Sequence, residues 1–374
     1  MSKLFYVAEI NLPSFRAYTI HVLKIVDAFT NSLKTQLIIP FSSKIYNYKK
    51  IKNDFLLTSK KKFQIKNIFN KEFVSTTIKR ILFGFKSALY LKKKVNAIII
   101  TRSITTSLFL IFFKKKHILE IHQKFSRLSH FFFIFLNIIE SKYIINIIFI
   151  TRAIQNEYKN KNINFLVLPD GVNLKNFKYK IKIKKHIKNI YYIGSFYKGR
   201  GIEIIFKLAK FFANKNFFLY GHRDEYIPNN IKNIKNIKIY KFIKYNEVPK
   251  VAKNADLFLM PYSLKEVEMN AKGKISNIAK YTSPIKMFEY LASGTPIVAS
   301  NLPVLREILI HNENSLIVRN NSINNWVKSI NLIDRNLSLR KLISQRAYET
   351  AKIHTWEKRA KRILDSIKVG IYKT

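Results

Sequence analysis

The chain of 374 residues contains no cysteine. The absence of thiols excludes a disulfide-stapled secreted scaffold, a catalytic cysteine, a cysteine-ligated zinc and an iron–sulfur cluster. Acidic residues are also scarce, since 22 Asp and Glu stand against 68 Lys and Arg, for a net charge of +46. Hydrophobic residues nevertheless make up 48% of the chain, which is enough for full cores and excludes a largely disordered protein. At about 150 residues per domain, this length predicts two domains, or three at most.

The cations are spread along the whole chain rather than gathered in one tail or stripe. This distribution indicates a general compositional bias, and lysine runs such as 60–62, 92–94 and 114–116 are typical of solvated helix ends. No helix-turn-helix, zinc-finger or RNP motif is present, so we expect no specific nucleic-acid partner. The charge favours anionic partners, namely nucleotide phosphates and acidic lipid surfaces. A non-enzymatic polyanion-binding protein therefore stays open as an alternative.

Long hydrophobic runs are missing as well. The apolar run at 4–8 is too short for a signal peptide, and those at 107–113 and 131–139 fall short of the ~20 residues of a spanning helix. We therefore expect a cytoplasmic protein. The basic, aromatic segment 77–94 (TIKRILFGFKSALYLKKK) predicts a surface helix, and it also fits a helix lying on an anionic bilayer. Such a helix would place the protein peripherally on the inner face of the cytoplasmic membrane.

Short β-rich runs alternate with helical patterns, which predicts an α/β architecture with parallel sheets. The expected strands are 4–10, 97–101, 117–122, 147–151, 165–168, 189–193, 217–220, 237–240, 256–260 and 296–300, and the expected helices are 18–29, 202–213, 248–253, 284–292 and the last ~30 residues. The highly charged stretch 175–188 predicts a linker between two domains, 1–174 and 189–345. We expect residues 346–374 to form a C-terminal helix that packs back towards the N-terminal domain. Ligands of open α/β sheets bind beyond the carboxyl ends of the strands.

One segment, 281–307 (YTSPIKMFEYLASGTPIVASNLPVLRE), carries the clearest helix signals. Ser283 is a good N-cap residue, and Pro284 fits the first helical position because its missing N–H is not needed there. Gly294 provides the stop at the other end. The segment therefore predicts a helix whose N-terminus follows a loop.

Two charged residues of this helix indicate a binding site. Lys286 falls in the first turn, where the helix dipole disfavours a cation by ~0.3–1 kcal/mol. A lysine beside a helix N-terminus is well suited to a phosphate or diphosphate. Glu289 lies on the same face and is able to accept hydrogen bonds from sugar hydroxyls. The alternative reading of the same residues is an ordinary surface ion pair.

A second segment, 191–203 (YYIGSFYKGRGIE), predicts a strand, a glycine-containing loop at 194–201 and a helix. Glycine allows close backbone approach to phosphate, and Arg200 can give paired, charge-assisted hydrogen bonds. The segment matches neither the dinucleotide fingerprint nor the Walker loop.

Together these pieces resemble glycosyltransferase family 4, of the group 1 type, which has the GT-B fold. The run SPIKMFEYLASGTPIVASNLPVLREIL resembles the donor-site signature of that family. The resemblance extends along the chain through PSFRAYTIHVLKIVDAF, HILEIH, ITRAIQNEY, LPDGVNLKNF, YIGSFYKGRGIE and ADLFLMPY. It implies two Rossmann-like domains facing across an interdomain cleft.

The resemblance also implies roles for particular residues. Arg200 matches the residue that binds the donor diphosphate, Glu289 the acidic residue placed on the ribose, and His122 the histidine that faces the transferred sugar. The expected catalytic residues are His122, Arg200 and Lys286. The expected donor-binding residues are Ser14, Ala17, Gly194, Ser195, Arg200, Pro261, Tyr262, Ser283, Pro284, Ile285, Lys286 and Glu289.

Two positions depart from the family pattern. Tyr281 stands where the first glutamate of the Glu-x7-Glu pattern is expected, and Ser195 replaces a second phosphate-binding arginine. Lys286 is positioned to replace that lost positive charge.

The activity implied is transfer of a sugar from a nucleotide-sugar donor to a surface-glycan or lipid-linked saccharide acceptor, as in polysaccharide or lipopolysaccharide biosynthesis. The resemblance further implies retention of anomeric configuration. The absence of an Asp-x-Asp motif agrees with catalysis without a metal, and no cofactor is expected. A GT-B-fold nucleotide-sugar epimerase is the enzymatic alternative.

Overall fold

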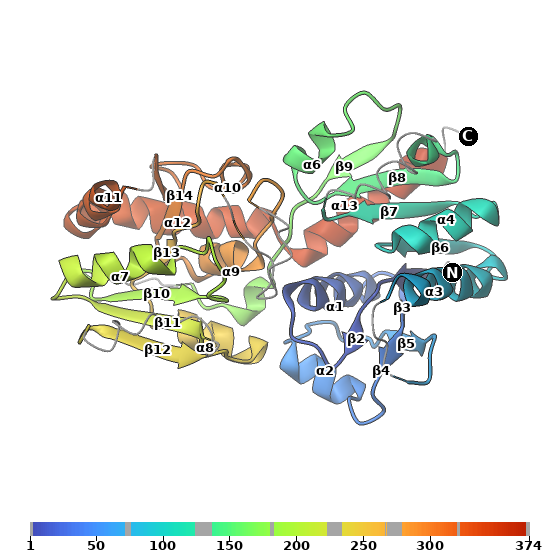
Figure 1. Ribbon diagram of the computed structural model, residues 1–374, viewed down its shortest axis with the longest axis horizontal. Helices are drawn as coiled ribbons and strands as arrows, with labels where there is room; N and C mark the ends of the chain where they lie inside the picture. The colour runs from blue at the N-terminus through green and yellow to red at the C-terminus, as the bar shows by residue number, and fades with distance from the viewer. Residues whose placement is uncertain are drawn as a thin grey trace. The chain divides into compact units, whose positions relative to one another are not determined.

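The computed structural model describes residues 3–71, 76–123, 137–179, 183–222, 234–265, 267, 279–319 and 322–371. The chain divides into two compact units. The first unit comprises Met1–Asp170 and Trp356–Thr374, and the second unit comprises Gly171–Thr355. The two units are described separately below (Figure 1).

A parallel sheet of seven strands, in the order β5-β3-β1-β6-β7-β8-β9, forms the centre of the first unit. Its strands are β1 (Lys3–Val7), β3 (Lys34–Ile39), β5 (Gln64–Asn67), β6 (Ala97–Thr101), β7 (His117–Ile121), β8 (Ile144–Phe149) and β9 (Phe165–Val167), and a separate pair is formed by β2 (Asn11–Leu12) and β4 (Phe41–Ser42). All five residues of β7 are buried. The apolar residues of such strands are buried because helices cover both faces of a parallel sheet.

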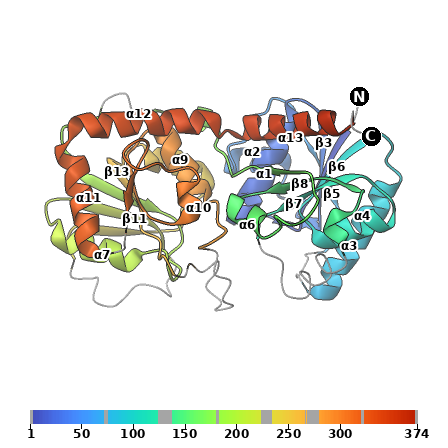
Figure 2. The same cartoon turned by 90° about the horizontal axis from the view of Figure 1, so that it is seen from above.

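The helices of the first unit are α1 (Ala17–Thr30), α2 (Tyr48–Asp54), α3 (Thr77–Lys92), α4 (Ile104–Phe112), α6 (Arg152–Asn156) and α13 (Trp356–Ile371), with a 3-10 turn at Ile138–Glu140. The C-terminal helix α13 packs against α1, so the last helix of the chain completes the N-terminal unit (Figure 2). Helices α3 and α4 also pack closely against each other.

The second unit is built on a parallel sheet of six strands in the order β12-β11-β10-β13-β14-β15. Its elements are β10 (Asn189–Ile193), α7 (Ile202–Phe211), β11 (Asn216–His222), β12 (Ile237–Lys241), α8 (Val248–Ala252), β13 (Leu257–Met260), α9 (Ile285–Ser293), β14 (Ile297–Ser300), α10 (Pro303–Arg306), β15 (Leu316–Val318), α11 (Ile323–Arg335) and α12 (Leu337–Ile353), with 3-10 turns at Leu174–Asn176 and Tyr245–Glu247. Trp326 of α11 is fully buried in the core that α7 and the sheet share.

The α/β class with parallel sheets in two Rossmann-like units is confirmed. The unit boundaries fall after Asp170 and after Thr355, rather than at 174 and 345. The difference at the second boundary arises because 337–353 forms α12, which packs on α9 of the second unit, and only the next helix belongs to the first unit. The apolar run at 107–113 lies largely in α4, and part of the run at 131–139 lies outside the described residues.

Candidate active site

Two loops at the carboxyl ends of neighbouring strands form the base of the candidate site in the second unit. One follows β10 and the other follows β13. They touch at Gly201, where an added Cβ atom would lie only 1.7 Å from the carbonyl oxygen of Pro261. The backbone N–H of Ser263 also donates to the carbonyl oxygen of Gly199, at 2.8 Å. Gly201 has φ +77°, so both its conformation and its surroundings require glycine.

The first loop is itself held by close backbone contacts. An added Cβ at Gly221 would come within 2.2 Å of the carbonyl oxygen of Gly194. The hydroxyl of Tyr192 donates to the carbonyl oxygen of Ser195 at 2.9 Å, and the hydroxyl of Tyr290 donates to that of Ile193 at 3.1 Å. Gly194 and Ser195, which are predicted to bind the nucleotide-sugar donor, therefore lie in a loop whose backbone is held by contacts on several sides.

Helix α9 begins one residue later than the sequence predicts. Its N-cap residue is Pro284, with extended φ −76° and ψ 117°, and its first helical residue is Ile285. Ser283 is therefore not the N-cap, and Lys286 is the second helical residue rather than the third. The cause is the proline, because its fixed φ is compatible with the N-cap as well as with the first helical position. Lys286 remains in the first turn.

Lys286 and Arg200 come together around one aromatic ring. The Nζ atom of Lys286 lies 4.9 Å from the centre of the Tyr262 ring, and the Cζ atom of Arg200 lies 5.2 Å from the same centre. Lys286 Nζ also lies 4.0 Å from the centre of the Tyr192 ring. An added Cβ at Gly194 would approach Lys286 Nζ to 2.9 Å, so glycine makes room for the ammonium group. The structure thus unites two of the predicted catalytic residues.

The charges of this cluster favour an anionic ligand. Burial lowers the pKa of Lys286 well below its usual value of 10.5, the nearby Arg200 adds to the effect, and Glu289 opposes it. Glu289 is only 5% exposed, one turn further along α9, so the pair is not the ordinary surface ion pair of the alternative reading. Two cations held together beside a helix N-terminus are stabilised when a phosphate or diphosphate binds between them.

The predicted residues of the first unit lie in two places. Ser14 belongs to the loop before α1, where its Oγ accepts a hydrogen bond of 3.3 Å from Thr19, and Ala17 is the exposed first residue of α1. His122 directly follows β7, and its side chain is 18% exposed. These residues belong to the first unit, whereas the two loops described above belong to the second.

His122 is part of a buried polar network centred on Glu120. The Oε1 atom of Glu120 accepts from Nε2 of His122 at 2.8 Å, from Nε2 of His21 at 3.0 Å and from Nη2 of Arg359 at 2.7 Å. Its Oε2 atom accepts from the hydroxyl of Tyr6 at 2.5 Å. Burial by itself raises the pKa of Glu120, but Arg359, His21 and His122 outweigh it and hold that pKa well below the usual range. Glu120 is therefore a carboxylate.

His21, Glu120 and His122 offer ligand atoms within 4.8 Å of one another, a spacing that also suits a metal ion. The surrounding contacts favour a different assignment. Arg359 donates to the same carboxylate oxygen, and its positive charge would oppose a cation there. His21 also uses its second nitrogen, since Nδ1 lies 2.5 Å from Oδ1 of Asp170. We assign these residues to an ion-pair network.

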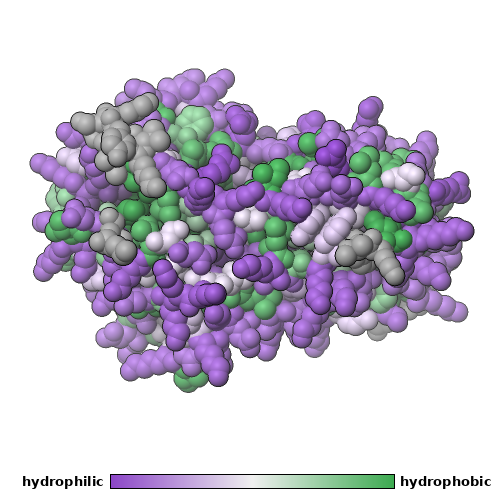
Figure 3. Space-filling model, turned by 180° about the vertical axis from the view of Figure 1, so that it is seen from behind, coloured by the Kyte–Doolittle hydropathy of each residue, from purple (hydrophilic) through white to green (hydrophobic). Residues whose placement is uncertain are grey.

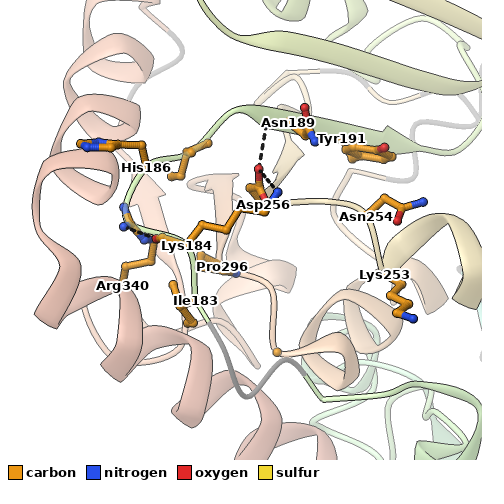
Figure 4. A pocket seen from close by; sticks show the side chains of 12 residues that line it. Ile183, Lys184, His186, Asn189, Tyr191, Lys253, Asn254, Asp256, Pro296 and Arg340 are labelled. Atoms are coloured by element: carbon orange, nitrogen blue, oxygen red, sulfur yellow. Dashed lines mark hydrogen bonds and ion pairs between the residues drawn. The ribbon is translucent and has the colours of Figure 1, made fainter.

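A cavity of about 450 Å³ lies at the opposite edge of the second sheet (Figure 4). It is lined by Asn189, Asp256 and Pro296, which stand at the amino ends of β10, β13 and β14. Asp256 accepts hydrogen bonds there from Lys184 at 3.3 Å and from the backbone of Asn189 at 3.0 Å. Because parallel α/β sheets bind ligands at the carboxyl ends, we place the candidate site at the other edge.

Sequence reasoning missed several residues that shape the two sites. Tyr192 is the aromatic partner of Lys286, and its only signal is an unusual pair of adjacent tyrosines. Glu120, Arg359 and His21 carry the network around His122. The Glu-x-His spacing at the end of a strand was the available signal for Glu120.

Residues 173–350 match the family model "Glycosyl transferases group 1". No curated protein matches the chain. Among solved structures, the chain is similar to HepE of Anabaena in complex with UDP and glucose, with a TM-score of 0.72 and 12% identity over 99% of this chain and 100% of that one. A TarM variant of S. aureus, in complex with Fondaparinux, alpha-GlcNAc-glycerol and UDP, gives a TM-score of 0.68 and 14% identity over 98% and 99%. WaaG, a glycosyltransferase involved in lipopolysaccharide biosynthesis, is similar with a TM-score of 0.64 and 13% identity over 97% of this chain and 98% of that one.

These similarities define the fold as GT-B. The matched segment covers nearly all of the second unit, which is a group 1 glycosyltransferase domain and contains the Arg200–Lys286 cluster. The expectation of a glycosyltransferase is thereby confirmed.

Proposed function

We propose that the protein transfers a sugar from a nucleotide-sugar donor to a saccharide acceptor, as a member of family 4. The observation that supports this most strongly is the pair of cations, Arg200 and Lys286, gathered around the Tyr262 ring. Breaking the bond between sugar and diphosphate places negative charge on the leaving group. Fixed positive groups at that point stabilise the transition state, and removing one costs ~2.7–4 kcal/mol.

The other predicted residues have places in this proposal. Glu289 would accept a hydrogen bond from a ribose hydroxyl, and His122 would contact the transferred sugar. Retention of anomeric configuration and catalysis without a metal remain predictions. The first is tested by determining the anomeric configuration of the product, and the second by assaying transfer in the presence of a chelator.

For the acceptor we propose a surface-glycan or lipid-linked saccharide. WaaG acts in lipopolysaccharide biosynthesis and TarM was crystallised with alpha-GlcNAc-glycerol, which makes a glycan acceptor the natural candidate for a chain of the same fold. A cytoplasmic location remains a prediction. Within the described residues, no helix has the length and hydrophobicity needed to cross a bilayer.

We further propose that the surface of α3 rests on an anionic bilayer. The buried face of α3 includes Phe83, Ser87 and Leu91. The opposite face, at 100° per residue, carries a stripe of exposed apolar side chains. Its members are Ile78 at 72% exposure, Ile81 at 45%, Leu82 at 43%, Phe85 at 39% and Leu89 at 41%. We call these five residues the α3 stripe.

The charge around the α3 stripe fits acidic lipid. The segment 77–116 contains ten Lys and Arg residues and no Asp or Glu. The stripe continues onto α4, where the Phe85 ring lies 5.4 Å from that of Phe109. Hydrophilic side chains cover most of the face of the molecule that is seen from behind in Figure 3. All charged residues of α3 itself are cations, one of which, Arg80, pairs with Glu9. An exposed apolar stripe on such a helix is typical of helices at an anionic membrane surface.

The transferase proposal is tested by thermal shift and by transfer assays with a panel of nucleoside diphosphates and nucleotide sugars. A diphosphate of one nucleoside should raise the melting temperature, and Arg200→Ala should abolish that response. The control is Arg346→Ala, since Arg346 is an exposed residue of α12 in the same unit.

Other outcomes would favour the alternatives. Conversion of the nucleotide sugar to its epimer without transfer would favour the epimerase. A response to polyanions of every kind, with a steep dependence on salt and none to nucleotides, would favour the polyanion-binding protein.

A further inference from the structure

The network around Glu120 contains two histidines whose contacts differ. His122 engages the network through Nε2 alone, whereas both ring nitrogens of His21 face carboxylate oxygens. A carboxylate accepts hydrogen bonds and does not donate them, so each nitrogen that contacts one must carry a proton. By this criterion His21 holds two ring protons and His122 needs only one.

We infer that His21 is the positively charged member of this network and a positioning residue that keeps His122 neutral. The single ring proton of His122 then lies on Nε2, and the lone pair on Nδ1 of His122 can accept a hydrogen bond from a sugar hydroxyl. Only the contact between His122 and a sugar hydroxyl rests on the proposed function. The protonation of the two rings follows from the contacts of the first unit.

The balance of charge supports the inference. Glu120 and Asp170 bring two negative charges into a region where Glu120 is 2% exposed and Asp170 7%. Arg359 supplies one positive charge, and a second one on His21 makes the group neutral. A buried ion group is tolerated only when its charges are paired in this way. A further proton on His122 would leave an excess positive charge.

The contact between His21 and Asp170 marks the position of that second proton. Nδ1 of His21 lies 2.5 Å from Oδ1 of Asp170, and a ring nitrogen that close to a carboxylate oxygen is a hydrogen-bond donor. The rings of His21 and His122 meet edge to face at 4.4 Å, and the buried Trp356 closes the other side of His21 at 5.1 Å. Two positive rings at that separation repel each other strongly.

Most of the described groups around the pair disfavour a proton on the second nitrogen of His122. Burial lowers the pKa of His122 well below its usual value, Arg102 and His21 lower it further, and only Glu120 raises it. The other groups are Asp170, which follows β9, Arg359 on α13, and Tyr6 on β1, whose pKa burial and Glu120 raise well above the usual value. Tyr6 is therefore a neutral hydrogen-bond donor.

The first test uses the unmodified protein with isotope-labelled histidine. Its eight histidine rings are observed by nuclear magnetic resonance, and the His21 and His122 signals are assigned by their loss in variants. At neutral pH we expect both ring nitrogens of His21 to carry protons and His122 to carry one, on Nε2. An unprotonated nitrogen on His21, or a proton on Nδ1 of His122 alone, would overturn the inference.

The second test is His21→Gln, which retains an N–H donor for Glu120 and removes the charge. We expect the proton affinity of His122 to rise at least tenfold, and the acidic limb of the transfer rate to move to higher pH. The matched control is His117→Gln. His117 is a fully buried histidine of β7 that contacts Ser107 and a backbone carbonyl outside the network.

The outcomes separate the two proposals. An unchanged titration of His122 in His21→Gln, with sugar transfer intact, would refute the role of His21 alone. The expected titration, with no transfer from any nucleotide sugar, would refute the proposed function and leave the inference standing. The measurements on the unmodified protein decide the matter if His21→Gln does not fold.

Discussion

The ammonium group of Lys286 lies 4.0 Å from the centre of the Tyr192 ring, on the side where Gly194 leaves room for it. An aromatic face attracts a cation, but a ring carries no net charge to neutralise it. The lysine is therefore held in place at a point where a bound anion favours its protonated form. Several expectations depend on this arrangement.

Loss of either cation should impair catalysis more than folding. We expect Arg200→Ala and Lys286→Ala each to lower kcat/KM for sugar transfer by ~10²–10³. The Arg346→Ala control should retain full activity. Steady-state kinetics with a saturating acceptor measure the effect. A loss below threefold in both variants would contradict a role for the cluster in stabilising the leaving diphosphate.

Binding of a nucleoside diphosphate should be coupled to proton uptake. The pKa of Lys286 is lowered well below 10.5, chiefly by burial, and a bound diphosphate raises it again because opposite charges attract. At a pH above the lowered pKa, binding therefore takes up a proton, and affinity falls as the pH rises. Calorimetry in buffers of different ionisation enthalpy measures the uptake.

The variant Lys286→Arg provides the control for this coupling, because arginine stays charged throughout. It should bind with little proton uptake and a flatter pH dependence. Identical uptake in the variant and the unmodified protein would assign the coupled proton to another group.

The contact between the two loops of the second unit should be sensitive to one methyl group. In Gly201→Ala the new Cβ would lie 1.7 Å from the Pro261 carbonyl oxygen, so the loops must separate. We expect the thermal shift caused by nucleoside diphosphate to disappear. Gly84→Ala is the matched control, because its Cβ would lie 2.7 Å from the Thr105 backbone in the first unit. That variant should lose stability and keep its nucleotide response.

The α3 stripe should govern binding to acidic vesicles. We expect the double variant Ile78→Ser and Leu82→Ser to bind phosphatidylglycerol vesicles at least tenfold more weakly in a sedimentation assay. Ile45→Ser should bind normally, although Ile45 is 79% exposed in the same unit. No vesicle binding by the unmodified protein at low salt would refute the membrane proposal. Concentration-dependent dimers lost in the double variant would identify a second copy as the occupant instead.

A buried histidine outside the site should make stability depend on pH. Burial lowers the pKa of His117 to about 4. Its usual pKa is about 6.5, so between these values the unfolded chain binds the proton and the folded chain does not, and stability falls as the pH falls. The loss amounts to about 2 kcal/mol between pH 7 and pH 5. Urea unfolding should show it, and His117→Gln should lack this part of the slope.

Local patterns were enough to predict most of the central strands. The bounds of β6 and β10 match the expected ranges because each is a short apolar run enclosed by polar residues. The start of α9 was misplaced by one residue, because the signals of Ser283 and Pro284 fit two helix registers. Local reasoning therefore found most of the central strands, but it did not predict β3, β5 or β15.

The partners of buried charges were beyond the reach of local patterns. His21 lies on a helix whose residues are nearly all buried, so it looks like a core residue. Its partners Glu120 and Asp170 stand 99 and 149 residues away in the sequence. Nothing in the spacing of residues around position 21 indicates such contacts, which depend on how distant segments meet in the fold.

The presence of Arg359 on α13 has a consequence for synthesis of the protein. A ribosome completes the whole second unit before it adds the arginine that neutralises Glu120 in the first. Until then the nascent first unit lacks both that arginine and Trp356, which packs beside His21. The first unit, although it is synthesised first, thus completes its folding last. A chain released before α13 is made would have an incompletely folded first unit.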